Sequence, residues 1–191
     1  TERAKKFAEE TPRNKLRRKE FQILDQAWLD AFLERGAFGT LATSYEGQPF
    51  VHPSLYVYIK EENAVYIHAA KSGRRWANVI LNPKVSFNVS ELGDFQAAPS
   101  AAEFVMDYSS VTIFGTCEIV ESHAERRLAL EAIMLKYAPH MTPGEHYAPL
   151  TDKEVDSPAL YKINIEEMTG KDRQSEPKGE TYTYTFPPGE K

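Results

Sequence analysis

Apolar residues along the chain change their period several times, and each change predicts a new secondary-structure element. From 25 to 35 they recur at helical spacing, with Asp25 able to cap the start of a helix and Gly36 placed where the helix would stop. The period then becomes two, which predicts strands at 39–43, 51–59 and 64–69. A short polar turn separates the last two strands, so we expect them to form a hairpin.

Alternation within this hairpin predicts which side chains face the core. The odd positions of the first strand are apolar, so we expect an inward-facing set of Val51, Pro53, Leu55, Val57 and Ile59. In the second strand the same rule places Val65, Ile67 and Ala69 on one face. It leaves Tyr66 and His68 on the opposite face.

The remaining elements follow from similar signals. Ser72 can cap a helix that runs to 81, where Asn82-Pro83 ends it, and Ser122 with Glu125 forms a capping-box pattern for a helix to about 137. Strands are predicted at 85–90, 110–120 and 160–165, and a long loop at 91–107. Most neighbouring strands are joined by turns rather than crossover helices. This order predicts a mainly β, α+β fold, an antiparallel barrel with peripheral helices.

The ends of the apolar pattern set the expected domain boundaries. Residues 1–20 are charged and have no apolar period, so we expect them to form an arm. We expect the folded domain to span residues 21–171, followed by a polar tail at 172–191. A length of 191 residues suits one domain of ordinary size.

Composition narrows the classes of function. With 23 Lys+Arg against 28 Asp+Glu the net charge is −5, which argues against a general nucleic-acid binder. The single cysteine, Cys117, excludes an intrachain disulfide and any zinc site that needs several thiolates. No apolar run approaches the roughly 20 residues that cross a bilayer. These features predict a cytoplasmic protein that does not enter a membrane.

A short basic cluster, 71–75, stands out against the acidic balance. It lies where a strand is expected to give way to a helix, whose first N–H groups are unpaired and carry a partial positive charge. Gly73 permits close backbone approach, Ser72 adds a hydroxyl, and Arg74 and Arg75 add bidentate donors. Such a cluster suits a phosphate, although a solvated helix start explains the same residues. The GxxxxGK[ST] and GxGxxG patterns are missing, which disfavours a Walker loop and a Rossmann fold.

The histidines, the cysteine and the tyrosines allow few other sites. None of the five histidines has close metal-ligand spacing, so no protein-only metal site is expected. His68 is either a hydrogen-bonded structural residue or a group for proton transfer. Cys117 is expected to pack in the core. The tyrosines at 56, 58 and 66 suit core packing, or else a wall against a planar ligand.

Several separated stretches resemble the FMN-binding split barrel, a superfamily related to pyridoxamine 5′-phosphate oxidase. They are GTLAT (39–43), GQPFVHP (47–53), VYIHAA (65–70), GRR (73–75), NPKV (82–85), YSSVTIFG (108–115) and INIEEMTGK (163–171). Within the superfamily the likeness is greatest to nitroimidazole-resistance reductases. It covers about residues 15–171.

The resemblance implies a six-stranded antiparallel split barrel that forms a homodimer with FMN at the subunit interface. Ser72, Arg74 and Arg75 would hold the phosphate, Arg75 standing where the family usually has a lysine, and His68 would act near the flavin as the catalytic residue. The full set of cofactor-binding residues that the resemblance implies is His52, Pro53, Ser54, Leu55, Ile67, His68, Ala69, Ser72, Gly73, Arg74, Arg75 and Ser110.

These features predict an FMN-dependent oxidoreductase of small planar or nitro-type substrates, with NAD(P)H or another donor docking transiently. Vitamin B6 oxidation is disfavoured, because the tail at 182–188 lacks the arginine–histidine signature of true pyridoxamine phosphate oxidases. Two alternatives stay open. One is a non-catalytic flavin- or haem-binding module, with His68 or His52 as axial ligand, and the other is a deazaflavin-using reductase.

Overall fold

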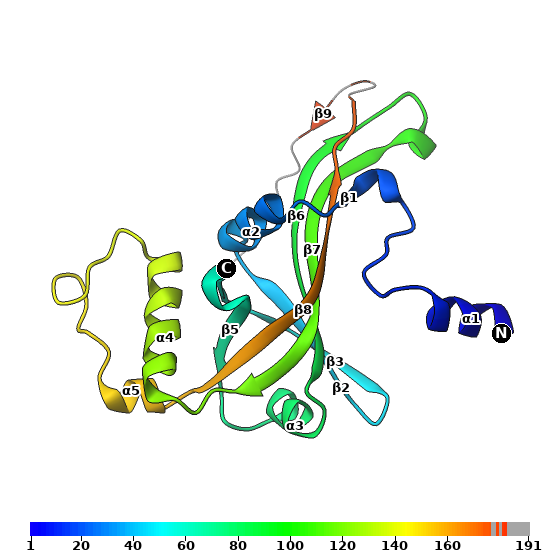
Figure 1. Cartoon of the computed structure of the whole chain (residues 1–191). Helices are drawn as coiled ribbons and strands as arrows, with labels where there is room; N and C mark the ends of the chain where they lie inside the picture. The colour runs from blue at the N-terminus through cyan, green and yellow to red at the C-terminus, as the bar shows by residue number, and fades with distance from the viewer. Residues whose placement is uncertain (177–178, 180, 183–191) are drawn as a thin grey trace.

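An antiparallel sheet forms the centre of the molecule in the computed structural model, which describes residues 1–176, 179 and 181–182 (Figure 1). Its strands are β1 (Gln22–Ile23), β2 (Gly39–Tyr45), β3 (Gln48–Ser54), β4 (Val57–Ile59), β5 (Ala64–Ala69), β6 (Lys84–Gln96), β7 (Val105–Ile119), β8 (Ala159–Arg173) and β9 (Thr181–Tyr182). Seven strands follow the order β3-β2-β6-β7-β8-β5-β4, while β1 pairs with β8 and β9 with β6.

The helices lie at the periphery of this sheet. They are α1 (Glu2–Glu10), α2 (Gln26–Arg35), α3 (Arg74–Leu81), α4 (His123–Tyr137) and α5 (Asp152–Asp156), with 3-10 turns η1 (Lys19–Phe21), η2 (Lys60–Glu62) and η3 (Ala101–Glu103). The predicted antiparallel, α+β character with peripheral helices is therefore confirmed. Among the described residues no helix is both long and apolar enough to span a membrane.

Two clusters of buried apolar residues lie on opposite faces of the sheet. Val65 and Ile67 pack with α2 residues in the larger cluster, whereas Tyr66 packs with α4 residues in the smaller one. This split confirms the alternation predicted for β5. It also makes α2 and α4 the helices that cover the two faces.

The prediction of a six-stranded barrel is wrong in its strand number for the part of the chain that is described, and the sheet does not close into a barrel there. The sheet has nine strands, and its path ends at β3 and β4, which do not pair with each other. One reason is that the predicted strand 51–59 breaks at Leu55 and Tyr56, which belong to neither strand.

The predicted inward face of 51–59 is confirmed for Val57, which is buried, but is wrong for the first half of the segment. Val51 is 62% exposed, because β3 is an edge strand that pairs only with β2 within the described chain, and Leu55, which follows β3, is 51% exposed. Tyr56 and Tyr58 are buried instead, because each hydroxyl finds an acceptor: the Leu33 carbonyl at 2.6 Å for Tyr56 and Asp30 at 2.9 Å for Tyr58.

The predicted loop 91–107 is largely a long hairpin in the structure. Strand β6 continues to Gln96 and β7 begins at Val105, with η3 at the tip. The buried Gln96 amide donates to Asp107 at 2.8 Å, so the two strands share a polar pair that the apolar pattern did not reveal. Much of the predicted polar tail lies outside the described residues, although β8 runs on to Arg173.

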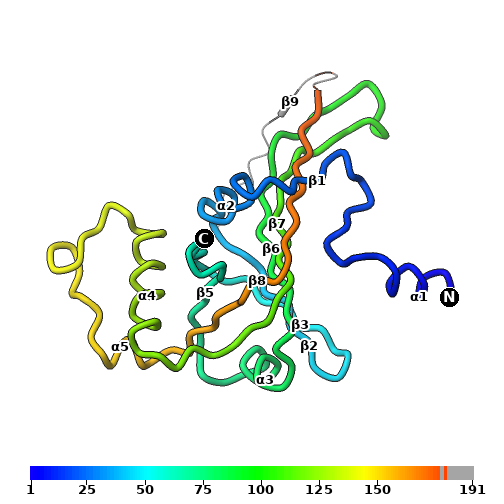
Figure 2. Tube along the Cα trace, in the orientation of Figure 1, coloured from blue at the N-terminus to red at the C-terminus, as the bar shows by residue number. Residues whose placement is uncertain are grey.

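The N-terminal arm stands away from the body, as Figure 2 shows for α1. No residue of α1 is buried. The arm is attached further along, where Arg13 donates to Glu166 at 2.7 Å and to Glu167 at 3.1 Å on β8.

Candidate functional site

The basic cluster lies at the turn between β5 and α3. Gly73 caps α3 with a φ of +95°, a left-handed conformation that favours glycine, and the space around it is open. The N-cap is thus Gly73 and not the predicted Ser72, so a side-chain cap is missing at this helix start. Because the first intrahelical bond runs from Ala77 N–H to the Gly73 carbonyl, the earlier N–H groups of the helix are left for another acceptor.

Arg75 connects this helix start to two strands. Its Nη1 donates to Ser54 Oγ on β3 at 2.9 Å, and its guanidinium lies 5.1 Å from the ring centroid of Tyr161 on β8. Ser54 Oγ is also 3.3 Å from Nδ1 of His52. The structure therefore brings together three of the predicted residues, His52, Ser54 and Arg75.

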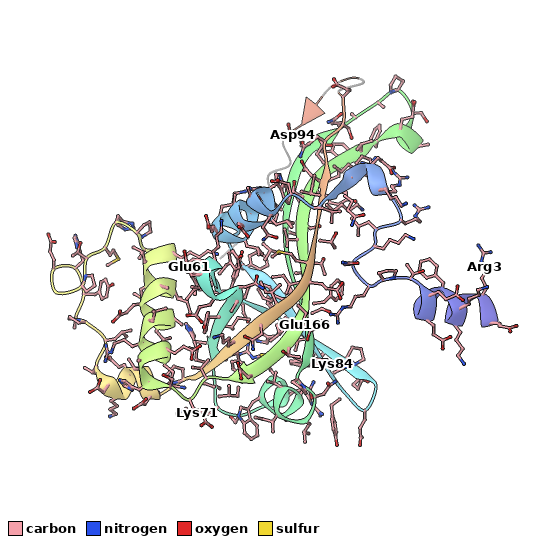
Figure 3. All side chains as sticks on the ribbon, in the orientation of Figure 1. Arg3, Glu61, Lys71, Lys84, Asp94 and Glu166 are labelled. Carbon is pink, nitrogen blue, oxygen red and sulfur yellow. The ribbon has the colours of Figure 1, made fainter. Side chains whose placement is uncertain are left out.

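The other two cations of the cluster differ from Arg75. Lys71, which is labelled in Figure 3, donates to the backbone carbonyl of Asp156, the last residue of α5. Arg74 is exposed, and among the described residues neither Arg74 nor Arg75 has a carboxylate within 4.0 Å. This end of the barrel thus carries positive charge that no acidic side chain of the described chain neutralises.

Among the described residues, the backbone of β5 next to the cluster has a free edge. Strand β4 pairs with β5 only as far as Tyr66, so Ile67, His68 and Ala69 pair on one side alone, with β8. The Ile67 side chain is fully buried in the core, so only its backbone is open to a ligand. Pro53 is exposed on the nearby edge strand β3, and Leu55 is exposed just after that strand ends.

His68 points away from the arginines. It lines a cavity of about 260 Å³ between the sheet and α4, whose other lining residues are Leu130, Ile133, Met134, Leu150, Glu154 and Pro158. Desolvation, together with repulsion from Arg75, lowers the pKa of His68 below its ordinary value. The imidazole is therefore mostly neutral at pH 7.

Ser110 does not join the other predicted residues within one chain. Ser110 lies on β7, and the strand order places β6 and β2 between β7 and β3. The neighbouring residue Val111 is buried. Because side chains alternate along a strand, Ser110 lies on the face opposite the core.

Other candidates of the sequence have structural roles. Cys117 is buried, and burial raises the pKa of its thiol to about 12, which removes it as a nucleophile. The tyrosines at 56, 58 and 66 belong to the two apolar clusters, so they pack in the core. In the described chain no three or more His, Cys, Asp or Glu side chains gather as a metal site.

Tyr161 is the member of the site that sequence reasoning missed. In the sequence it is one more position of an apolar strand, and only the packing of Arg75 over its ring reveals its contribution.

An antiparallel sheet with covering helices and an anion-suited helix start at one end fits the split-barrel class. A model of the family described as pyridoxamine 5′-phosphate oxidase matches residues 25–172. The chain belongs to that family, and the resemblance seen in the sequence is confirmed.

Solved structures agree with this assignment at the level of the fold. The flavocytochrome Anf3 from Azotobacter vinelandii has a TM-score of 0.76 at 22% identity, covering 94% of this chain and 88% of its own. An FAD- and haem-binding protein from Mycobacterium smegmatis has a TM-score of 0.71 at 22% identity, with coverage of 83% and 76%.

A putative 5-nitroimidazole antibiotic resistance protein from Bacteroides thetaiotaomicron is also similar. Its TM-score is 0.64 at 22% identity, with coverage of 78% of this chain and 85% of its own. Comparison with curated proteins found no match.

Proposed function

We propose that the chain is an FMN-dependent oxidoreductase of small planar or nitro-type substrates, with the flavin phosphate on the helix start at 72–75. The observation that carries this proposal is the position of Arg75, whose side chain spans from α3 to Ser54 and Tyr161. Membership of the pyridoxamine 5′-phosphate oxidase family supports it.

The donor set fits a phosphate dianion. Arg74 and Arg75 lack carboxylate partners among the described residues, Ser72 is exposed, and the first N–H groups of α3 are unbonded within the helix. A phosphate recruits such donors because charge-assisted bonds to guanidinium groups are strong. Bound flavin would supply hydride chemistry.

The chain's own groups then have distinct tasks. His52, Pro53, Ser54 and Leu55 would lie beside the ring, and the free backbone edge of Ile67–Ala69 would accept or donate hydrogen bonds along the cofactor. His68 would exchange a proton with a substrate at the α4 side of β5. Its lowered pKa makes it an acceptor rather than a donor at pH 7.

A second copy of the chain completes this proposal. The edge strand β3 and the adjoining chain expose Phe38, Val51 and Leu55, which are 56%, 62% and 51% exposed. Trp76 and Ile80 of α3 are exposed as well. Exposed apolar groups on neighbouring elements suit a subunit interface, from which Ser110 of the second copy could reach the flavin.

The visible spectrum of the purified protein tests the cofactor. We expect flavin absorption, or tight binding of added FMN, and at least a tenfold loss of FMN affinity when Arg74 and Arg75 are both replaced by alanine, since bonds to charged groups contribute about 1.5–3 kcal/mol each. The matched control replaces two exposed arginines of the arm, Arg3 and Arg17, by alanine. A colourless protein without affinity for FMN would exclude the proposal.

Haem is a second candidate ligand, and the cavity of about 260 Å³ beside His68 would have to widen to admit a porphyrin. His68 and Met134 line the same largely apolar cavity, and histidine and methionine are both known haem-iron ligands. Two of the similar folds are a flavocytochrome and an FAD- and haem-binding protein. Haem binding predicts a Soret band that His68→Ala removes while flavin absorption remains. No Soret band on adding haem rules this candidate out.

A further inference from the structure

A second cavity, separate from the helix start at 72–75, opens between α2, β4 and α4. Its volume is about 660 Å³, within the range of small-molecule sites. The walls are mainly apolar and include Val57, Tyr58, Ile59, Leu128, Ala132 and Leu135. Leu128 and Leu135 are 49% and 66% exposed, so no described residue of the chain covers this face of α4.

Lys136 is the cation of this groove. Its Nζ lies 3.6 Å from the ring centroid of Tyr56 and donates to the Leu33 carbonyl near the end of α2 at 3.3 Å. An ammonium group has three donors, so this bond leaves others available. In the described chain no carboxylate lies within 4.0 Å of Nζ, and burial lowers the pKa of Lys136 to about 8.

The acidic side chains that line the groove with Lys136 come from two elements, α2 and η2. Glu34 of α2 is exposed and raises the pKa of Lys136 without forming an ion pair, and Glu61 of η2 is exposed at the rim, as labelled in Figure 3. Glu62 accepts from Lys162 at 2.7 Å and is thereby neutralised.

The remaining polar groups near Lys136 do not titrate near neutral pH. Burial raises the pKa values of Tyr56, Tyr58 and Tyr137 above their ordinary range. Lys60, the other cation of this region, is paired with Asp30 at 2.9 Å. Lys136 is therefore the group that changes charge between pH 7 and 9.

We infer that this groove binds an organic monoanion with an apolar body, such as a medium-chain carboxylate, whose charged end pairs with Lys136. The apolar walls would cover the body, and a half-buried ammonium without a carboxylate partner would take the charge. Glu34 and Glu61 at the rim disfavour polyanions such as nucleotides, which distinguishes this site from the one proposed for a flavin phosphate.

Isothermal titration of the purified protein with decanoate, and with the neutral alcohol 1-decanol as matched ligand, tests the inference. At pH 7 we expect decanoate to bind, and Lys136→Met to weaken it about tenfold or more while leaving 1-decanol little changed. The control variant Lys84→Met removes an exposed lysine outside the groove and should bind both ligands as the parent does. If Lys136→Met weakened the binding of decanoate and of 1-decanol equally, the proposed pairing of the carboxylate with Lys136 would be overturned.

The pH dependence gives an independent readout. The charge on Lys136 is present below its pKa and is lost above it, so decanoate affinity should fall about tenfold between pH 7 and pH 9. Lys136→Arg should keep binding and abolish this fall. If Lys136→Met does not fold, Leu135→Glu, at an exposed position, should weaken decanoate by placing a like charge in the groove. No binding of decanoate at pH 7, or affinity independent of pH, would overturn the inference.

Discussion

Asp30 illustrates how single residues hold the larger core together. The side chain is nearly fully buried on α2, accepts from Gln26 at 2.7 Å and from Tyr58 at 2.9 Å, and pairs with Lys60 at 2.9 Å. Desolvation by itself would raise the pKa of Asp30, but the bonds from Lys60, Gln26 and Tyr58 outweigh it and hold the pKa below its usual value. The carboxylate therefore stabilises the fold in its charged form.

Lowering the pH should remove the stabilisation that the charged Asp30 carboxylate gives to the fold. Because the folded pKa of Asp30 is lower than the unfolded one, its stabilisation is present above the unfolded value of about 3.8 and is lost as the pH falls through the folded value. We expect Asp30→Asn to lower the free energy of unfolding at pH 7 by about 2 kcal/mol and to reduce its loss between pH 5 and pH 2. Urea unfolding at several pH values measures both. An unchanged pH profile in the variant would contradict this role.

At the scale of elements, the longest strands depend on one glycine. The register between β7 and β8 shifts between Phe114 and Gly115, so a bulge lies where the sequence predicted a bend. A Cβ added at Gly115 would lie 2.0 Å from the backbone carbonyl oxygen of Asn164. The backbones of the two strands approach each other at a distance that only glycine permits.

We expect Gly115→Ala to lower the free energy of unfolding by about 2 kcal/mol or more, because backbone cannot move aside as a side chain can. Gly144→Ala is the matched control: it has a φ of +84° but open space, so its cost is backbone strain of roughly 1–2 kcal/mol. Thermal and urea unfolding compare the two. A Gly115→Ala variant as stable as the parent would show that the strands can separate.

At the scale of the whole molecule, charge and apolar surface are distributed unevenly. A chain with a net charge of −5 concentrates Lys71, Arg74 and Arg75 at one end of the sheet. Beside them, β3 and α3 expose apolar side chains that no described residue of the single chain covers. A second copy on this face would cover the apolar groups and enclose the positive charge.

Val51→Glu therefore tests the proposed dimer. A carboxylate at the centre of an apolar interface should shift the protein toward monomer by at least tenfold in dissociation constant, since burying an unpaired charge is costly. Sedimentation equilibrium measures the shift, and FMN titration shows whether affinity falls with it. Leu92→Glu, at a 60% exposed apolar position on β6, is the matched control. A parent protein that is already monomeric would contradict the dimer.

Local signals predicted most elements but not how they end or pair. The helix at 25–35 follows from periodicity and was confirmed, and the hairpin predicted between 51–59 and 64–69 was confirmed over 57–66. The full length of β6 and β7 could not be predicted from periodicity, because their outer halves contain Gly93 and show no regular apolar alternation. These outer halves are strands because they pair with each other across the hairpin. Within the site, the sequence indicated Arg75 and Ser54 but not their bond, since 21 positions separate them along the chain.

The sequence by itself determined the antiparallel class, the basic helix start and the face of β5 that carries His68, because periodicity, turn residues and charge act over a few residues. Only the tertiary structure decided that His68 faces α4 rather than the arginines, that Tyr161 supports Arg75, and that Lys136 ends in an apolar groove. These outcomes depend on contacts between residues distant along the chain. Such contacts arise from the order of strands in the sheet and from which helix covers each face.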